Sequence, residues 1–414
     1  MGAKTYPAYR DSGVEWIGEI PEHWEVKKLR FNCRMQSGDF IDATCINESG
    51  TYPVYGGNGI RGFSETKNRT GKALLVGRQG ALCGNVHLVN GEYWASEHAI
   101  VTQPAQLSTH EYLLYMLQWM NLGRHSISAA QPGLSVQHIQ KQISIAPPLE
   151  EQKQIASFLD RETSKIDTLI EKQQQLINLL KEKRGSLISH TVTKGLNPNV
   201  PMKDSGVEWI GEIPEHWEVK RISQVSPVQR GASPRPIDNP IYFDDEGDYG
   251  WVRISDVTES KGFLSTTSQR LSSLGSSLSV KLQAGEMILS IAGSVGKSAV
   301  LMDRFCIHDG FVYFPRFSQP KRWLYFIFET QNVFGGLGKL GTQLNLNTET
   351  VKNIYIPYPS QSDRHEIISF LDAETSKIDT LIDKANQSIT LLKERRSSLI
   401  SAAVTGKIDV REAA

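Results

Sequence analysis

The sequence lacks the features of a membrane, secreted or metal-binding protein. No apolar run approaches the ~20 residues that a membrane span needs, and the opening residues MGAKTYPAYRDSG contain no signal-peptide core. The four cysteines lie far apart, without a CxxC pair or zinc-ligand spacing. This pattern favours reduced thiols over the alternative of a disulfide framework. We therefore expect a soluble, cytoplasmic chain with no membrane contact and no metal site.

The sequence also lacks an excess of charge of either sign. Lysine and arginine number 45, as do aspartate and glutamate, so the formal net charge is zero. This balance argues against a nucleic-acid binder that acts through charge alone, but it is compatible with local basic faces. With 39% hydrophobic and 22% charged residues, the 414-residue chain has a globular composition. Its length predicts about two to four domains.

Catalytic motifs are missing as well. The sequence contains no GxSxG nucleophile elbow, no HExxH zinc motif and no EF-hand loop. GSVGKS at 293–298 ends like a phosphate-binding loop, but its first glycine stands too close to the second to wrap phosphates. The acidic run DDEGD at 244–248 is a candidate for a hard cation, with a solvated acidic loop as the favoured alternative. We expect no catalytic residue in this chain.

What the chain does contain is an internal duplication. The seventeen residues DSGVEWIGEIPEHWEVK occur at 11–27 and again at 204–220. SFLDRETSKIDTLI at 157–170 returns at 369–382 with a single change. The stretches between these blocks barely resemble each other. Alike blocks indicate one kind of partner met twice, and unlike regions indicate two different targets. Recent duplication followed by drift is the alternative, although it does not explain why identity is confined to bounded blocks.

The blocks divide the chain twice into an arm, a variable region and a long helix. Because the two halves are related by the repeat, we predict a pseudo-two-fold organisation. The predicted domains are an N-terminal arm 1–27, a first variable domain 28–150, a central helix 151–195, a linker and second arm 196–220, a second variable domain 221–360, a C-terminal helix 361–402 and a tail 403–414.

The shared helical segments carry apolar residues at three-and-four spacing over some 40 residues. A helix of that length cannot bury its apolar stripe alone, so we predict that the two helices pack together as an antiparallel coiled coil. Two separate amphipathic helices, each lying on its own domain, are the alternative. The residues predicted to form the contact are Ile166, Leu169, Leu176, Leu180, Ile378, Leu381 and Leu392.

The variable regions predict mixed α/β (α+β) domains. Short apolar runs such as 72–78 and 286–293 alternate with glycine, asparagine and proline, which is typical of strands joined by turns. Each region also contains a helical stretch, at 108–120 and 321–330. Near the end of each region, Ser135 or Asn347 is a plausible N-cap of a further short helix.

Charge and loop composition favour nucleic acid as the target of the variable regions. Residues 28–149 contain ten basic against seven acidic side chains, and residues 220–361 contain fifteen against twelve. Arginine suits guanine edges, Asn and Gln suit adenine edges, and glycine lets a backbone approach the duplex closely. For each residue taken singly, a turn or surface role is the alternative. The candidate DNA-binding residues are Asn58, Arg61, Arg78, Gln79, Gln229, Arg230, Ser233, Arg235, Asn239, Ser294 and Lys297.

The repeated blocks resemble the specificity subunit of type I restriction-modification systems. The resemblance rests on DSGVEWIGEIPEHWE, present twice, and on IAPPLEEQKQIASFLDRETSKIDTLI with its second copy, and it covers essentially the whole chain. YGGNGIRG and GRQGALCGN also look like segments of the family's target-recognition domains. The family's fold has two such domains, each mixed α/β, separated by two long helices in an antiparallel coiled coil.

The resemblance implies a non-catalytic, sequence-specific DNA-recognition subunit. Each domain would read one half of an asymmetric bipartite site in double-stranded DNA, and the helices would set the gap. Two modification subunits, with S-adenosylmethionine for adenine-N6 methylation, would dock on the shared regions. Two restriction (motor-nuclease) subunits would bring ATP- and Mg-dependent translocation and cleavage. No cofactor is expected in this chain itself.

The sequence departs from the family pattern at one place. LEEQ at 149–152 has QSDR at 361–364 as its counterpart, so contacts with a partner are expected to differ there. Contact residues in the variable regions cannot be transferred by motif, because family members diverge there. Two other functions stay open: a self-sufficient DNA methyltransferase or nuclease, and a coiled-coil scaffold that binds only proteins.

Overall fold

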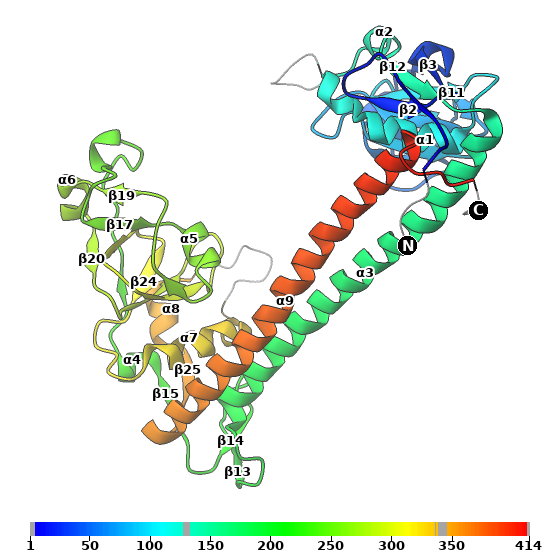
Figure 1. Cartoon of the computed structure of the whole chain (residues 1–414). Coiled ribbons are helices and arrows are strands. Elements are labelled where there is room, and N and C mark those ends of the chain that lie inside the picture. Colours follow the sequence, from blue (N-terminus) through cyan, green and yellow to red (C-terminus); the bar gives the residue numbers. More distant parts are fainter. Residues whose placement is uncertain (1–4, 127–132, 336, 338–345, 412–414) are drawn as a thin grey trace. The chain divides into compact units, whose positions relative to one another are not determined.

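The computed structural model places almost the whole chain, and it divides into two compact units. The residues outside the description are 1–4, 127–132, 336, 338–345 and 412–414. Unit 1 consists of Met1–Gln174 and Asn386–Ala414, and unit 2 consists of Gln175–Ala385. Each unit thus contains one segment of each of the two long helices, α3 (Leu149–Lys194) and α9 (Gln361–Val404) (Figure 1).

Unit 1 begins with a short arm, residues 5–24, followed by head 1, residues 25–146. The arm is a two-stranded antiparallel sheet of β1 (Tyr9–Asp11) and β2 (Glu19–Pro21). The strands of head 1 are β3 (Glu25–Lys28), β4 (Cys33–Ser37), β5 (Tyr52–Gly56), β6 (Gly59–Ser64), β7 (Arg69–Thr70), β8 (Ala73–Gly77), β9 (Val86–Val89), β10 (Glu92–Ala95), β11 (Ala99–Pro104) and β12 (Ile143–Ala146). Its helices are η1 (Leu29–Phe31), η2 (Ala43–Cys45), α1 (His110–Met120), η3 (Leu122–His125) and α2 (Val136–Ile139).

Unit 2 repeats this plan with arm 2, residues 196–217, and head 2, residues 218–358. The arm pairs β13 (Met202–Asp204) with β14 (Glu212–Pro214). The strands of head 2 are β15 (Glu218–Arg221), β16 (Gln229–Arg230), β17 (Tyr249–Val252), β18 (Phe263–Leu264), β19 (Arg270–Leu271), β20 (Val280–Leu282), β21 (Met287–Ser290), β22 (Ser298–Leu301), β23 (Phe305–Ile307), β24 (Phe311–Tyr313) and β25 (Tyr355–Tyr358). Its helices are α4 (Ile222–Val225), η4 (Pro240–Tyr242), α5 (Ile254–Glu259), α6 (Ser273–Ser277), α7 (Lys321–Glu329), η5 (Asn332–Phe334) and α8 (Thr348–Lys352).

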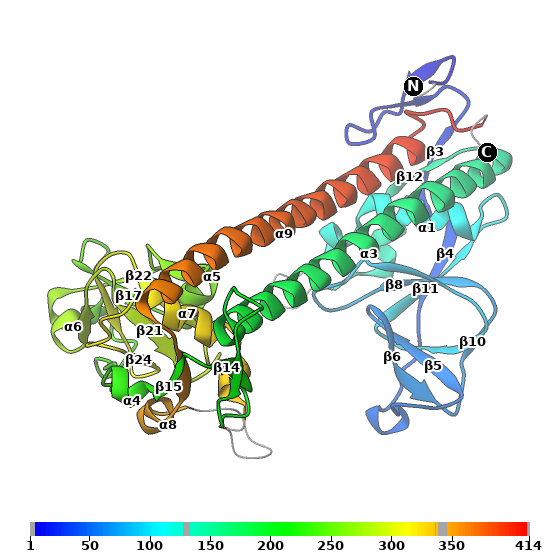
Figure 2. The same ribbon diagram turned by 90° about the horizontal axis from the view of Figure 1, so that it is seen from below.

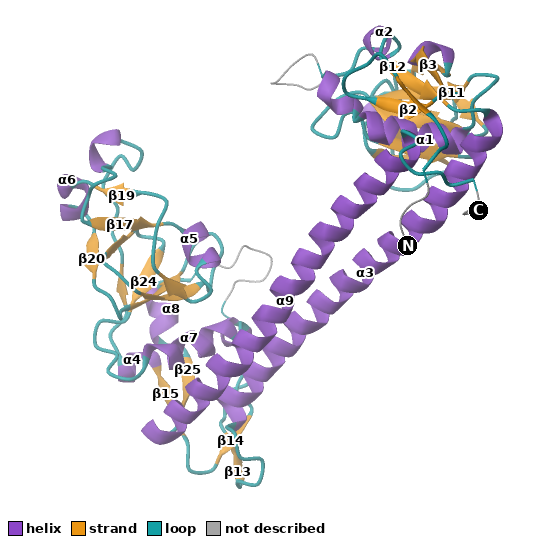
Figure 3. Cartoon of the chain, in the orientation of Figure 1, coloured by secondary structure: helices purple, strands orange, loops and turns teal. Residues whose placement is uncertain are grey.

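The two heads share one strand topology although their sequences differ. Head 1 contains the sheets β4-β11-β8-β9 and β6-β5-β10-β7, and head 2 contains β16-β24-β21-β22-β18 and β19-β17-β23-β20. In the second sheet of each head the two central strands run parallel, β5 with β10 and β17 with β23. Figure 3 shows strands and helices mixed in both heads. The predicted mixed α/β class is therefore confirmed.

The chain enters and leaves each head through a pair of neighbouring strands. β3 pairs antiparallel with β12 in unit 1, and β15 pairs antiparallel with β25 in unit 2. The predicted helices at 108–120 and 321–330 are present as α1 and α7. Asn347 caps α8 by accepting a hydrogen bond from Thr350 N, whereas Ser135 occupies the N-cap of α2 without such a bond.

Within each unit the segments of α3 and α9 run antiparallel and side by side (Figure 1 and Figure 2). In unit 1, Arg396 Nε donates to Asp167 Oδ1 at 2.9 Å. In unit 2, Arg184 Nε donates to Asp379 Oδ1 at 3.0 Å. The repeat aligns Asp167 with Asp379 and Arg184 with Arg396, so the two ion pairs are equivalent. In unit 1 α3 supplies the aspartate and α9 the arginine, and in unit 2 the two helices exchange these roles. The predicted antiparallel coiled coil is thus confirmed in both units.

The contact between the helices follows a strict three-four spacing, and this corrects part of the predicted set. Ile166, Leu180 and Ile378 are buried in it, and Leu392 is half-buried. Leu169, Leu176 and Leu381 were predicted wrongly, because their exposed fractions are 47%, 43% and 50%. Each of them stands one residue before the isoleucine that continues the spacing, namely Ile170, Ile177 and Ile382. Ile177 is buried and Ile170 and Ile382 are half-buried, because a narrow coiled-coil contact covers these positions and leaves the neighbouring leucines facing outward.

A carboxylate at the start of each long helix holds the arm in place. In unit 1, Glu151 accepts hydrogen bonds from Trp24 Nε1 at 2.9 Å and from His23 Nε2 at 2.7 Å. In unit 2, Asp363 accepts them from Trp217 Nε1 at 3.2 Å and His216 Nε2 at 3.3 Å. The change from LEEQ to QSDR thus preserves this contact inside the unit.

Each unit also has its own hydrophobic core, which joins the arm, the head and the helix ends. In unit 1 the core contains Trp24, Tyr112 and Val404, and in unit 2 it contains Trp217, Trp323 and Val192. The four cysteines are free thiols, as predicted. Among the described residues, no helix is long and apolar enough to cross a membrane.

Candidate nucleic-acid interface

In head 1, three loops that contain candidate residues meet at one end of the sheets. They are the β5–β6 turn at 57–58, the β8–β9 loop at 78–85 and the β10–β11 turn at 96–98. A Cβ atom added to Gly77 would lie 1.9 Å from Gly57 O, and one added to Gly57 would lie 2.8 Å from Gln79 O. These glycines therefore let the loops approach one another. The sequence suggested that glycines in these loops let the backbone approach the duplex; at Gly57 and Gly77 the structure shows a close approach between loops.

The polar side chains of these loops are bound to one another. Gln79 Oε1 lies 2.7 Å from His98 Nδ1, and Asn58 Oδ1 accepts a hydrogen bond from Asn85 Nδ2 at 2.7 Å. Arg78 is half-buried, and its guanidinium donates to Glu97 O at 3.4 Å. The structure therefore brings Asn58, Arg78 and Gln79 together, as one polar surface at the loop end of head 1.

Arg61 lies beside this group, on strand β6. Its side chain is exposed and passes over Gly56, where an added Cβ would lie 3.1 Å from Arg61 Cδ. A larger residue at position 56 would push the guanidinium away. The glycine thus keeps Arg61 close to the turn that holds Asn58.

In head 2, three of the candidates converge on one residue that the sequence did not single out, Asp309. Ser233 Oγ donates to Asp309 Oδ1 at 2.9 Å, and Arg235 donates to Asp309 Oδ2 at 2.7 Å. Arg230 Nε donates to the backbone carbonyl of Asp309. Asp309 is separated from these residues by more than 70 positions, so no local pattern could have found it. A histidine-aspartate-glycine turn after an apolar strand is the only trace in the sequence.

The charges around Asp309 decide its ionisation. Burial opposes ionisation, but the hydrogen bond from Ser233 and the charges of Arg235 and Arg230 outweigh it and hold the pKa of Asp309 below its ordinary value. Next to it, burial lowers the pKa of His308, whose Nδ1 accepts a hydrogen bond from Gly310 N at 2.9 Å. The site therefore presents Arg235 bound to an ionised carboxylate and Arg230 bound to the backbone carbonyl of the same residue, with the imidazole of His308 at the edge.

The remaining candidates of head 2 have different environments. Gln229 is exposed on β16 and is hydrogen-bonded to Tyr313. Ser294 is exposed in the β21–β22 loop, and Lys297 is half-buried there, with its backbone amide bound to Ser290 Oγ at 2.9 Å. Asn239 is not part of the cluster, because its side chain caps η4 by accepting from Ile241 N at 3.1 Å. For Asn239 the turn role predicted as the alternative holds.

The two sites have one turn in common in the shared topology. The β8–β9 loop of head 1 corresponds to the β21–β22 loop of head 2 in the shared topology, and the β10–β11 turn corresponds to the β23–β24 turn. The same close approach recurs at two glycines that the repeat aligns. A Cβ on Gly38 would lie 2.2 Å from Ser96 O, and one on Gly231 would lie 2.2 Å from His308 O. The common turn therefore presents His98 in head 1 and Asp309 in head 2. Their partners come from different loops, because Gln79 lies between β8 and β9, whereas Arg235 lies between β16 and β17.

Metal ligation finds no support in the described part of the chain. No group of three or more His, Cys, Asp and Glu side chains is placed there to hold an ion. The acidic run at 244–248 lies before β17, where Asp244 accepts from Glu246 N at 3.1 Å in a local turn. The solvated-loop interpretation of this run therefore fits the geometry.

Two similar heads with different polar ends, each attached to a coiled coil, define a class of two-site recognition proteins, and comparison with known proteins gives the family. The family described as type I restriction modification DNA specificity domain matches twice, over residues 21–179 and 214–391. The matches together span most of the chain. The chain belongs to this family, and the family assignment favours DNA specificity over a self-sufficient enzyme or a protein-only scaffold.

Individual relatives agree with this assignment. The chain is 39% identical over 173 residues to the type I restriction enzyme EcoprrI specificity subunit of Escherichia coli, an alignment that spans 41% of this chain and 42% of the relative. It is 25% identical over 95% of its length to the MjaVIII specificity subunit of Methanocaldococcus jannaschii, of which 94% is covered. A chain in a solved structure of the type I R-M system superimposes with a TM-score of 0.71 at 16% identity, covering 94% of this chain and 99% of that one, which supports the fold.

Proposed function

We propose that head 1 and head 2 each read one half of an asymmetric, bipartite sequence in double-stranded DNA. The observation that carries this proposal is a polar loop cluster in each of two heads of similar topology, with His98 and Asp309 at corresponding turns and different side chains around them. Arginine presents two donors to guanine O6 and N7, and a glutamine amide matches adenine N6 and N7. Heads that differ in these groups would select different bases.

In this proposal the arginines of head 2 are oriented before DNA arrives. Arg230 and Arg235 are both held by Asp309, which restricts their rotamers. A side chain that is already oriented loses less conformational entropy when it binds, so more of its hydrogen-bond energy becomes affinity. Asp309 itself would be a positioning residue, because an ionised carboxylate close to phosphates is repelled by them.

The long helices would set the gap between the half-sites. With 46 residues at ~1.5 Å each, α3 extends about 69 Å. The ion pairs Asp167–Arg396 and Arg184–Asp379 would fix the sliding register of the helices. A coiled coil held in register is stiff, as a spacing device requires.

We propose further that the chain contributes no catalytic group and binds no cofactor itself. Two modification subunits would dock on the shared regions and supply S-adenosylmethionine for adenine-N6 methylation, and two restriction subunits would supply ATP- and Mg-dependent translocation and cleavage. The repeat supports a partner that is met twice, because arm and helix contacts recur at equivalent residues in both units. The proposed role places the protein with the chromosome, in the cytoplasm.

Exchanging one head tests the proposal. Residues 221–360 are replaced by the corresponding region of a relative, and methylated adenines are mapped across the genome of a host that carries the partner subunits. We expect one half of the methylated sequence to change and the other half to stay. If both halves changed, or neither did, the assignment of one half-site to each head would be wrong. The reciprocal exchange of residues 28–150 is the matched control.

A further inference from the structure

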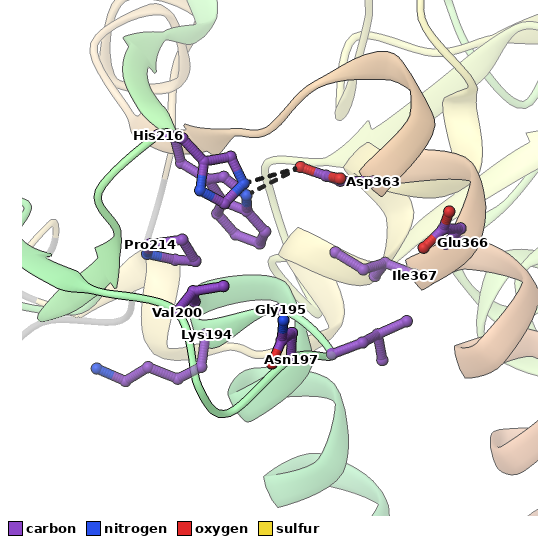
Figure 4. Close-up of a pocket in the computed structure, with 11 residues that line it drawn as sticks. Lys194, Gly195, Asn197, Val200, Pro214, His216, Asp363, Glu366 and Ile367 are labelled. Atoms are coloured by element: carbon purple, nitrogen blue, oxygen red, sulfur yellow. Dashed lines mark hydrogen bonds and ion pairs between the residues drawn. The ribbon is translucent and has the colours of Figure 1, made fainter.

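Unit 2 contains a pocket of about 260 Å³ where arm 2 meets the segments of the long helices (Figure 4). His216 and Asp363, joined by their hydrogen bond, lie on one side of it, and Gly195 and Asn197 lie on the opposite side. Trp217 also lines the pocket. The pocket is therefore apolar at one wall and carries a carboxylate and an imidazole at its rim.

The counterpart place in unit 1 is filled by a tyrosine. Tyr6 is buried, and its hydroxyl donates to Glu151 Oε2 at 3.1 Å. Its ring centroid lies 5.6 Å from that of Trp24 and 5.8 Å from that of His23. These three contacts, Glu151, Trp24 and His23, are the repeat counterparts of Asp363, Trp217 and His216. The molecule thus shows which group fits between a carboxylate, an indole and an imidazole arranged in this way.

Chain connectivity explains why unit 2 leaves the place open. In unit 1 two separate segments pack there, the residues before β1 and the residues after α9, and Arg411 from the second covers the ring of Tyr6 at 4.7 Å. In unit 2 a single segment, residues 195–201, leads directly from α3 to β13. Asn199 is the repeat counterpart of Tyr6, and it is exposed. One segment cannot supply the atoms of two, so a pocket remains.

The polar groups of the open pocket are correspondingly more exposed. The side chain of Glu151 is 11% exposed and that of Asp363 is 32% exposed. For the two histidines the fractions are 43% at His23 and 55% at His216. In unit 1 the phenol of Tyr6 covers the carboxylate, and in unit 2 no side chain of the chain covers that face of Asp363 among the described residues that line the pocket. A ligand that donates one hydrogen bond to Asp363 and packs edge-to-face against Trp217 would restore the arrangement of unit 1, where the rings of Tyr6 and Trp24 are inclined at 73°.

We propose that this pocket binds a phenol group, and that its source is a tyrosine side chain of a partner protein. A single aromatic side chain in a pocket is a common anchor of protein interfaces, because it buries a large apolar area and offers one directed hydrogen bond. The proposal uses no residue of the DNA-reading loops, so its failure would leave the proposed function untouched, and the reverse also holds.

Titration of the full-length protein with p-cresol, the side-chain analogue of tyrosine, tests the proposal. With ¹⁵N-labelled tryptophan, the indole N–H signal of Trp217 reports on the pocket, and it is identified by its loss in Trp217→Phe. We expect p-cresol to shift this signal in a saturable way, with millimolar affinity. The signal of Trp24 is the internal control and should not move, since Tyr6 already occupies its site. An unmoved Trp217 signal, or equal shifts of both signals, would overturn the proposal.

Three further measurements sharpen the result. Toluene lacks the hydroxyl and cannot donate to Asp363, so its affinity should be at least about tenfold lower than that of p-cresol. Val200 lines the pocket, so Val200→Trp should abolish the shift and Val200→Ala should keep it. In Tyr6→Ala, which opens the counterpart place, the Trp24 signal should begin to respond to p-cresol. Equal binding of toluene and p-cresol would refute the hydrogen bond to Asp363.

The source of the phenol is tested with N-acetyl-tyrosine methylamide, which carries the peptide groups of a protein-borne tyrosine. Binding at least as tight as that of p-cresol supports a partner's tyrosine. If the pocket takes p-cresol but rejects the amide, a free phenolic compound is the ligand, and the partner-protein assignment is wrong.

Discussion

The two heads meet equivalent aspartates of the long helices with different side chains. In head 1, Tyr115 donates to Asp160 Oδ1 at 2.6 Å. In head 2, Arg322 Nε donates to Asp372 Oδ1 at 3.0 Å. The repeat aligns Asp160 with Asp372, so the helix side of the contact is constant and the head side is not. The helices therefore offer a fixed set of acceptors, and each head satisfies it with whatever donor its own sequence provides.

At the starts of the two long helices, the residue that differs between the units is on the helix and not on the head. Gln152 is buried in unit 1, and its Nε2 donates to Leu107 O and Pro147 O, both at 2.9 Å. Its counterpart Arg364 is equally buried, and its guanidinium donates to Pro359 O and to Gln319 Oε1. It also lies 4.4 Å from the ring centroid of Tyr358. A neutral amide and a cation thus make the same backbone contact, but only the second has an aromatic ring to stack on.

The comparison predicts its largest effect for the helices that both units share. Deleting four residues, about one turn, from each helix at 171–174 and 383–386 should change the gap between the methylated half-sites or abolish methylation. Genome-wide mapping of methylated adenines measures both outcomes. The control is Glu171→Ala/Lys172→Ala, which keeps the length and should keep the gap. Methylation at the original spacing after the deletion would rule out the helices as the spacing device.

The next largest effect concerns Gln152 and Arg364, the buried counterpart residues at the starts of the two long helices. Gln152→Arg should destabilise unit 1 by about 3 kcal/mol, because the counterpart of Tyr358 there is Ala146 and a buried cation would lack its ring and its amide acceptor. Arg364→Gln should cost unit 2 only ~1 kcal/mol, since a glutamine can keep the bond to the backbone. Urea unfolding of the two variants measures the difference. Equal costs would mean that the two environments are equivalent.

An effect of intermediate size is expected at Tyr6, which packs beside arm 1 and has no equivalent tyrosine at arm 2. Tyr6→Phe removes the hydroxyl from a buried carboxylate, and we expect unit 1 to lose about 1–3 kcal/mol of stability. Hydrogen exchange at the Trp24 indole should accelerate, while exchange at the Trp217 indole stays as it is. Tyr242→Phe serves as control, because it removes an exposed hydroxyl that donates to Arg235 O. Accelerated exchange at Trp217 in Tyr6→Phe would contradict the separate docking of the arms.

A smaller effect separates the two reading sites. Asp309→Ala should lower the affinity of the assembled complex for its cognate DNA about tenfold, since Arg235 loses the carboxylate that orients it. The variant should discriminate less well between bases in one half-site only, and its discrimination in the other half-site should stay unchanged. Asn239→Ala is the matched control: it removes a cap worth ~1 kcal/mol of stability and should leave DNA affinity unchanged. Unchanged affinity in Asp309→Ala would refute its positioning role.

The smallest effect is a pH dependence at the same residue. Because the pKa of Asp309 is lower in the folded chain than its ordinary value of 3.8, its stabilising contribution is present above that pH and is lost as the pH falls below it. The gain should stay below about 1 kcal/mol, since the side chain is more than one-third exposed and water screens the pairing. The difference in unfolding free energy between wild type and Asp309→Asn should therefore shrink below pH 3.8. A constant difference down to pH 2 would contradict it.

Local patterns predicted the elements of this fold well and their contacts poorly. The three-four spacing predicted both long helices, but it did not decide between Leu169 and Ile170, because both suit a helix stripe and only the partner helix selects one. Glycine-rich loops contain several of the residues of the proposed reading sites, such as Gln79. Their internal contacts, such as Gln79 with His98 and Arg235 with Asp309, join residues from different strands. Such pairings depend on topology, which no short segment encodes.

The paired strands at the base of each head have an evolutionary consequence. Since β3 lies beside β12 and β15 lies beside β25, the two junctions of each head with the rest of its unit are neighbours in space. The coding sequence on either side of each head is a block that also occurs in the other half of the gene. Recombination between such blocks would transplant a complete head in one event and leave the arm and helix contacts intact, so new specificities can arise without new point mutations.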